Sequence, residues 1–161
     1  MNHLETLASE FLEWQGYLIR RNTKVGRRAR GGWEMELDVV GYNPHTNHLI
    51  HYEPSTDAHS WEKRETRFKT KFDLGRKYIF SELFTWLPDD LEVDQIAICP
   101  SRAAGRKTLG GGTLIAIDEF VAQIRDKIVE CGPARRNAIS ETYPLLRTLQ
   151  LTHCGYSKVI D

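Results

Sequence analysis

Two acidic side chains, Asp38 and Glu53, are the strongest candidates for metal chemistry in this chain. Residues 34–40 alternate polar and apolar side chains, which is typical of a β-strand, and they place Asp38 on the polar side. Residues 49–53 form a second expected strand after a turn at 43–47, so a hairpin is predicted. Two carboxylates that point the same way from neighbouring strands repel each other unless a cation lies between them.

Mg²⁺ suits such a pair, because it binds a few carboxylate oxygens and keeps water and phosphate oxygens at its other positions; Mn²⁺ is the expected substitute. A metal ion held in this way can orient a water molecule and neutralise charge that develops on a phosphodiester. The hairpin therefore predicts a metal site formed by Asp38 and Glu53. His51 is two positions from Glu53 and is a candidate auxiliary base.

Two basic, glycine-containing segments accompany the acids, at residues 20–32 and 101–112. The first holds six Lys or Arg residues and no Asp or Glu, and we expect it to be a flexible loop. Guanidinium groups match phosphates well, so a nucleic-acid face is predicted, although an ordinary solvated surface is the alternative. The expected phosphate contacts are Arg27, Arg28, Arg30, Arg106 and Lys107.

Length and composition limit the fold and the setting. The chain has 161 residues, is 40% hydrophobic and has a formal net charge of zero, which predicts one domain with a real core. Neutrality does not point to a general polyanion binder, but it can conceal a polarised molecule. The three cysteines are widely spaced, and the N-terminal residues have no signal-peptide pattern, so a cytoplasmic location is expected. No apolar run is long enough for a membrane span.

Hydrophobic periodicity predicts the elements that must position these residues. Helices are expected at 4–14, 61–84, 119–128 (with Asp118 as N-cap) and 139–151, and further buried strands at 94–100 and 114–117. The predicted fold is a single α/β domain over 1–161, with a central mixed sheet of four to five strands flanked by helices. Its core is expected at about 1–128, followed by a C-terminal helical extension at about 133–161.

The order of these features resembles the PD-(D/E)XK nuclease superfamily, which includes many restriction enzymes and Holliday-junction resolvases. The resemblance lies in an N-terminal helix with Glu10, a basic segment, the strand with Asp38, the strand ending in Glu53, and a long helix beyond. It implies a restriction-endonuclease-like core in which Asp38 and Glu53 bind the metal and Glu10 supports it through water. It also implies DNA as the substrate and a homodimer as the assembly.

One position departs from that family. Its last motif residue is a lysine two positions after the acid, and here that residue is Ser55. In some members this lysine is supplied by the neighbouring helix, which makes Lys63 or Lys69 a candidate, and Lys63 is our expected catalytic lysine. In other members a polar residue replaces this lysine, and in still others its loss accompanies loss of catalysis.

The leading hypothesis is therefore a Mg²⁺-dependent DNA endonuclease. The alternative is a catalytically inactive module of the same fold that binds nucleic acid or a protein partner. A third hypothesis is an interaction protein without a nucleic-acid role, whose partner surface would include Trp61, Phe80, Phe84 and Trp86, with core packing as the alternative for these residues.

Overall fold

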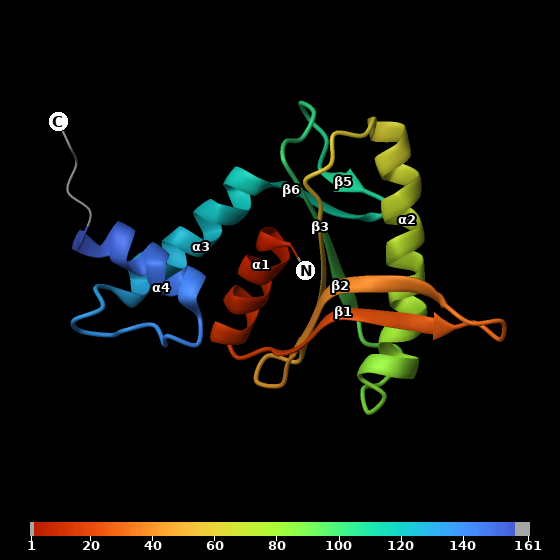
Figure 1. Ribbon diagram of the computed structural model, residues 1–161, viewed down its shortest axis with the longest axis horizontal. Coiled ribbons are helices and arrows are strands. Elements are labelled where there is room, and N and C mark those ends of the chain that lie inside the picture. The colour runs from red at the N-terminus through yellow and green to blue at the C-terminus, as the bar shows by residue number, and fades with distance from the viewer. Residues whose placement is uncertain (1, 157–161) are drawn as a thin grey trace.

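The computed structural model describes residues 2–156, which form an α/β fold with one open, mixed, six-stranded sheet (Figure 1). The strands are β1 (Leu18–Arg27), β2 (Trp33–Asn43), β3 (His48–Pro54), β4 (Val93–Cys99), β5 (Thr108–Leu109) and β6 (Gly112–Ala116). The helices are α1 (His3–Trp14), α2 (Trp61–Tyr78), α3 (Ile117–Cys131) and α4 (Pro144–Leu151), with short π-helical turns η1 (Ile79–Leu83) and η2 (Thr152–Tyr156).

The strand order is β1-β2-β3-β4-β6-β5. The first three strands form an antiparallel meander, because tight turns connect them. Strand β4 is parallel to β3, and α2 with η1 makes the crossover between them. Strand β6 continues the parallel part, and the short β5 closes the edge in the antiparallel direction.

Helices cover both faces of the sheet (Figure 1). On one face, Val39, Ile50 and Tyr52 pack in a buried cluster with apolar residues of α1, α3 and α4. On the other face, Val40 and Leu49 pack against the C-terminal end of α2 and against η1. This alternation along β2 and β3 decides which polar side chains of the hairpin meet α2.

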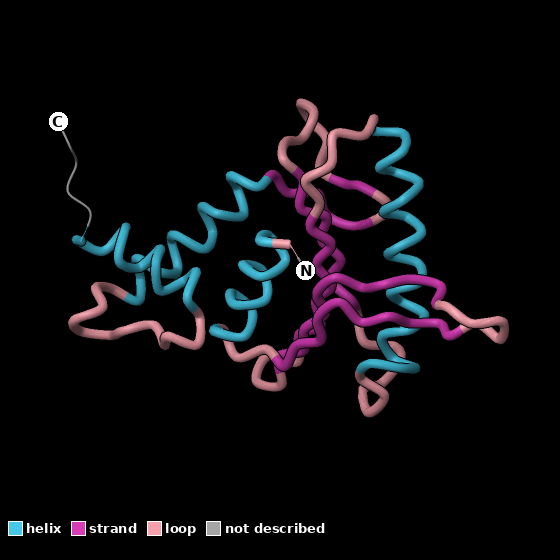
Figure 2. The backbone as a smooth tube through the Cα atoms, viewed as in Figure 1, coloured by secondary structure: helices cyan, strands magenta, loops and turns pink. Residues whose placement is uncertain are grey.

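The prediction of a flexible loop at residues 20–32 is wrong, because much of this segment forms β1. Together with the short β5, this strand brings the sheet to six strands. Val25 is fully buried and pairs with Met35, so an apolar anchor holds the basic segment in the edge strand. Only residues 28–32 turn, with Gly31 and Gly32 at positive φ. The β1–β2 hairpin projects beyond α2 (Figures 1 and 2).

Several helix boundaries differ from expectation. The long helix changes to π geometry after Tyr78, and the last helix begins at Pro144, whose fixed φ suits a first helical position. Asp118 lies inside the first turn of α3, and the N-cap is Ala116. Residues 157–161 of the expected C-terminal extension lie outside the described residues. Among residues 2–156, no helix combines the length and apolar character that crossing a membrane requires.

Candidate metal and catalytic site

Asp38 and Glu53 lie opposite each other on β2 and β3. The register pairs Val39 with Tyr52, so one further step places the two acids side by side. Val39 and Tyr52 point into the cluster with α1 and α3, and their neighbours Asp38 and Glu53 therefore point to the α2 face. Both acids are buried, and the Asp38 backbone N–H donates to Glu53 Oε1 over 3.2 Å.

Lys71 of α2 lies between the two carboxylates. Its Nζ is 3.1 Å from each carboxylate oxygen of Asp38 and also donates to Glu53 Oε2. Burial alone would lower the pKa of Lys71, but the Glu53 and Asp38 carboxylates raise it above its ordinary value. The structure therefore joins the sequence-predicted acid pair to a lysine on the neighbouring helix, although to Lys71 and not to Lys63 or Lys69.

The charges in this cluster do not balance, since one ammonium faces two carboxylates. Burial and the negative charge of Glu53 raise the pKa of Asp38 to about 8, against the opposing effect of Lys71. Burial would also raise the pKa of Glu53, but the hydrogen bond from His51 and the Lys71 charge lower it to about 2. Either a proton on Asp38 or an additional cation can offset the charge of the second carboxylate.

The donor set limits which cation fits. Among residues 2–156, no group of three His, Cys, Asp or Glu side chains is arranged to hold a metal ion. Two carboxylates alone suit Mg²⁺ or Mn²⁺, which keep most of their positions for water and phosphate oxygens, better than Zn²⁺ in a closed site. Asp38 and Glu53 would be the protein's ligands.

His51 fixes the orientation of Glu53. Its Nε2 is 2.8 Å from Glu53 Oε1, and its Nδ1 is 3.2 Å from Gln95 Nε2. Gln95 Nε2 also donates to the Phe72 carbonyl at 2.9 Å, so the amide nitrogen must be on this side. His51 Nδ1 is therefore an acceptor, and Nε2 carries the proton that Glu53 accepts. This arrangement makes His51 a buried support for Glu53, in contrast to the expected auxiliary base.

A glycine lets α2 approach this support. A Cβ at Gly75 would lie 2.7 Å from two ring atoms of His51, closer than real Cβ contacts. Only glycine therefore lets the helix pack this closely against the imidazole.

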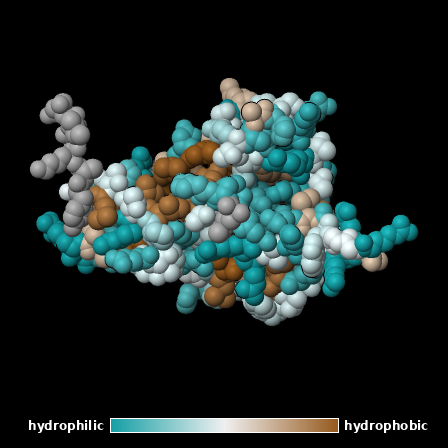
Figure 3. Space-filling model, in the orientation of Figure 1, coloured by the Kyte–Doolittle hydropathy of each residue, from teal (hydrophilic) through white to brown (hydrophobic). Residues whose placement is uncertain are grey.

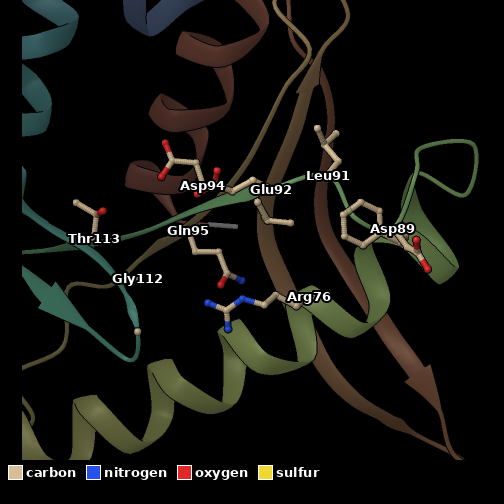
Figure 4. Close-up of a pocket in the computed structure, with 11 residues that line it drawn as sticks. Arg76, Asp89, Leu91, Glu92, Asp94, Gln95, Gly112 and Thr113 are labelled. Atoms are coloured by element: carbon tan, nitrogen blue, oxygen red, sulfur yellow. The ribbon is translucent and has the colours of Figure 1, made fainter.

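Gln95, the other partner of His51, also lines a pocket between β4 and α2. Figure 4 shows Gln95 reaching from β4 toward α2, where Arg76 borders this pocket. Gln95 Oε1 is buried and has no hydrogen-bond partner among the described residues.

Ser55, at the position of the family lysine, belongs to a separate ionic network. Its Oγ donates to Asp57 Oδ2 at 2.5 Å and accepts from Arg67 at 2.7 Å. Asp57 also pairs with Arg64 Nε at 3.1 Å and with Arg67 at 2.6 Å. Burial would raise the pKa of Asp57, but hydrogen bonds from Ser55 and Arg64 lower it well below its usual range. Ser55 thus holds α2 against the end of β3.

Glu10 was expected to support the metal site, but its carboxylate lies at the N-terminal end of α4. Its Oε2 accepts the backbone N–H groups of Leu145 at 2.9 Å and Leu146 at 3.1 Å. These are N–H groups of the first turn of α4, which have no partners within the helix. The carboxylate also interacts favourably with the positive end of the helix dipole. Glu10 therefore caps α4 from α1.

Replacing Glu10 by alanine is expected to lower the free energy of unfolding by about 1–3 kcal/mol, because one buried and one partly buried N–H group lose their acceptor. Urea unfolding of the two proteins measures the difference. An unfolding free energy equal to that of the wild-type protein would show that the contact between Glu10 and α4 does not stabilise the fold.

Lys63 lies on α2 eight residues before Lys71, which is about 12 Å along the helix axis. It lines a cleft beside Met35 and is not hydrogen-bonded to either acid. Lys69 is on the solvent side, paired with Asp73 at 2.7 Å. The sequence does hold a signal for Lys71, since it shares a helical face with the buried Phe68 and Gly75.

The basic residues predicted to contact phosphates divide into two groups. Arg27, Arg28 and Arg30 are exposed at the projecting tip of the β1–β2 hairpin, and the described residues provide no ion-pair partner for them. Arg106 stacks on Trp61 and pairs with Glu65 at 3.3 Å, and Lys107 is exposed in the loop before β5. The hairpin tip is therefore the stronger cationic surface.

No protein-family model, curated protein or solved structure matches this chain. Its function must accordingly be inferred from the cluster of Asp38, Glu53 and Lys71 and from the surfaces around it.

Proposed function

We propose that this protein is a Mg²⁺- or Mn²⁺-dependent DNA endonuclease built on a restriction-endonuclease-like core. The observation that carries the proposal is the contact of the Lys71 ammonium with both Asp38 and Glu53. Two buried acids on adjacent strands with one ammonium between them are costly for a purely structural site, since removing ionisable groups from water is unfavourable. Such a cost is expected where a site binds a cation and performs chemistry.

The topology supports the proposed core. An N-terminal helix precedes the meander of β1, β2 and β3, and the helix α2 then leads to β4, parallel to β3. The N-terminal helix, the strands with Asp38 and Glu53 and the long helix after them follow the order on which the resemblance to PD-(D/E)XK nucleases rests, whereas β1 replaces the expected basic loop. Lys71 also supports a catalytically active site on that fold. It places an amine from α2 beside both acids, and the hydroxyl of Ser55 cannot replace an amine.

The chemistry follows from what each side chain can do. Asp38 and Glu53 would hold the divalent ion, which supplies charge neutralisation at the phosphate and orientation of a water molecule. Lys71 can donate hydrogen bonds to a water molecule or to a phosphate oxygen, and its positive charge favours the pentavalent transition state. His51 keeps the Glu53 carboxylate oriented through the proton on Nε2.

The hairpin supports DNA as the substrate. Its hydrophilic tip extends away from the body of the molecule at the right of Figure 3, with Arg27, Arg28 and Arg30 exposed. Arginine forks bind phosphates bidentately, and a two-stranded ribbon fits a nucleic-acid groove. Lys107 would add a weaker contact near β5. Dimerisation stays a prediction.

Plasmid cleavage tests the proposal. The purified full chain is expected to nick or linearise supercoiled DNA with Mg²⁺ or Mn²⁺ and to be inactive in EDTA. Lys71→Gln should abolish cleavage, whereas Lys69→Gln, a matched charge change on the solvent side of α2, should retain it. Salt-dependent DNA binding without cleavage under either metal would favour the inactive binding module instead.

A further inference from the structure

A cleft of about 550 Å³ lies between β2 and the N-terminal half of α2, next to the acid cluster along the helix. Met35 of β2 lines it on one side, and α2 contributes two cations, Lys63 and Arg67. Neither the resemblance nor the metal chemistry assigns a role to this cleft.

The cations on this part of α2 form a row. Lys63, Arg67 and Lys71 are four residues apart, so their Cα atoms are separated by about 6 Å along the axis and share one side of the helix. One strand of duplex DNA carries a phosphate for every 3.4 Å or so of axial rise, and the path along the winding strand is longer. The row therefore suits neighbouring phosphates of a single strand.

Arg67 contributes positive charge that is not cancelled locally. Asp57 is shared by two guanidinium groups, and Arg64 is the buried one, with its side chain 9% exposed. The Arg67 side chain is 40% exposed and lines the cleft, whereas its Nε is buried. Asp57 pairs with Nη1 and Ser55 accepts from Nη2, and these contacts hold the guanidinium in place at the wall of the cleft. Such a preorganised guanidinium is a good phosphate ligand.

The other groups in the cleft limit how a strand can lie there. The hydroxyls of Thr66 and Thr70 donate to helix carbonyls, so the cations must bind the phosphates. Met35 offers an apolar surface for a sugar or base. Glu62 lines the same cleft and would repel a phosphate, which directs the strand toward Lys63 and Arg67.

We propose that this cleft binds the nucleotides next to the scissile phosphate, with Arg67 and Lys63 contacting successive phosphates of the strand that Lys71 contacts at the cut. The inference rests on the proposed nuclease function, because it takes the Asp38–Glu53–Lys71 cluster as the point of cleavage. It adds a path for the substrate strand along α2.

DNA binding without cleavage tests the inference. Anisotropy of a labelled DNA duplex and a labelled single strand is measured in EDTA at several salt concentrations, with full-length Lys63→Gln and Arg67→Gln variants. Each variant is expected to bind the DNA about 3- to 10-fold more weakly at low salt. Each should also reduce the slope of log affinity against log salt by about 1, as one lost phosphate contact does.

Three further variants make the result specific. Lys69→Gln removes the same charge from the opposite side of α2 and should leave the slope unchanged. Arg67→Lys should restore most of the slope, and Glu62→Gln should tighten binding. Because Arg67 also pairs with Asp57, thermal unfolding must show that its variants are folded. Lys63 is the independent probe, since its backbone N–H donates to Ser60 Oγ and its side chain has no hydrogen bond or ion pair among the described residues.

The outcomes separate this inference from the proposed function. Equal losses for Lys69→Gln and Lys63→Gln, unchanged binding by both cleft variants, or no DNA binding at low salt would each overturn the cleft assignment. Cleavage with unchanged cleft variants would leave the nuclease proposal standing and remove the cleft. Cleft-dependent DNA binding without cleavage under Mg²⁺ or Mn²⁺ would reject the nuclease proposal. The cleft would then stand as a binding site for a DNA strand.

Discussion

The Lys71→Met variant is expected to lose cleavage and to depend on Mg²⁺ for stability more than the wild-type protein does. Methionine keeps an unbranched side chain but removes the ammonium that contacts Asp38 and Glu53. Breaking a buried ion pair by removing one partner typically costs about 3–5 kcal/mol, because the other charge is left buried and unpaired. Cleavage should fall by at least about 10²- to 10³-fold with the loss of a positioned donor.

Mg²⁺ should recover much of that stability in the variant, since the two carboxylates then have no competing internal cation. A ligand at 100 times its dissociation constant stabilises the folded state by about 2.7 kcal/mol. Urea unfolding in EDTA and in excess Mg²⁺ measures the effect, and Lys69→Met is the matched control. A variant as stable as wild type in EDTA, or one that Mg²⁺ does not stabilise, would contradict the assignment of Lys71 to a metal-binding acid pair.

Substitutions at the two acids are expected to change stability in opposite directions while both abolish cleavage. The pKa of Asp38 is raised in the folded protein, to about 8. A carboxyl group with a raised folded-state pKa destabilises the fold at pH values above its ordinary pKa, because the unfolded chain loses that proton more easily. Asp38→Asn cannot ionise, so in EDTA at neutral pH it should be at least as stable as wild type.

Glu53→Gln should instead be less stable than wild type by about 3 kcal/mol. Glu53 accepts from the Asp38 N–H and the His51 Nε2–H at one oxygen and from Lys71 at the other. A glutamine that keeps its carbonyl toward the first two donors turns its NH₂ group toward the Lys71 ammonium. The lowered pKa of Glu53 gives the same sign, since its stabilising effect is present above its ordinary pKa.

Cleavage assays and urea unfolding of Asp38→Asn and Glu53→Gln, both in EDTA and in Mg²⁺, check this pair of expectations. The reversed order of stability, with Asp38→Asn much the weaker protein, would mean that Asp38 is a structural ion-pair partner of Lys71. Retained cleavage in either variant would remove that acid from the site.

The hairpin was predictable from sequence because its signals are local. Strict alternation defined the strand with Asp38, a polar turn followed it, and the predicted strands at 34–40 and 49–53 fall within β2 and β3. The juxtaposition of Asp38 and Glu53 then depends only on the register across one short turn. The parallel pairing of β4 with β3 also agrees with the expected mixed sheet.

Features that depend on distant contacts were not predictable in the same way. Glu10 binds backbone groups 135 and 136 residues away, and nothing local to α1 indicates that α4 docks there. The basic segment forms β1 because Val25 is buried and β2 supplies its hydrogen bonds, which outweighs its charged, glycine-containing composition. Lys71 was hidden among many basic residues of α2, since its role depends on the rotation of that helix against the sheet.

The count of Mn²⁺ ions bound per chain tests the central claim most directly, and the electron paramagnetic resonance signal of free Mn²⁺ measures it. The wild-type protein and Lys69→Gln are expected to bind one ion, and Asp38→Asn is expected to lose that ion while staying folded. Equal Mn²⁺ binding by wild type and Asp38→Asn, or no binding by wild type, would contradict a shared metal ion between β2 and β3.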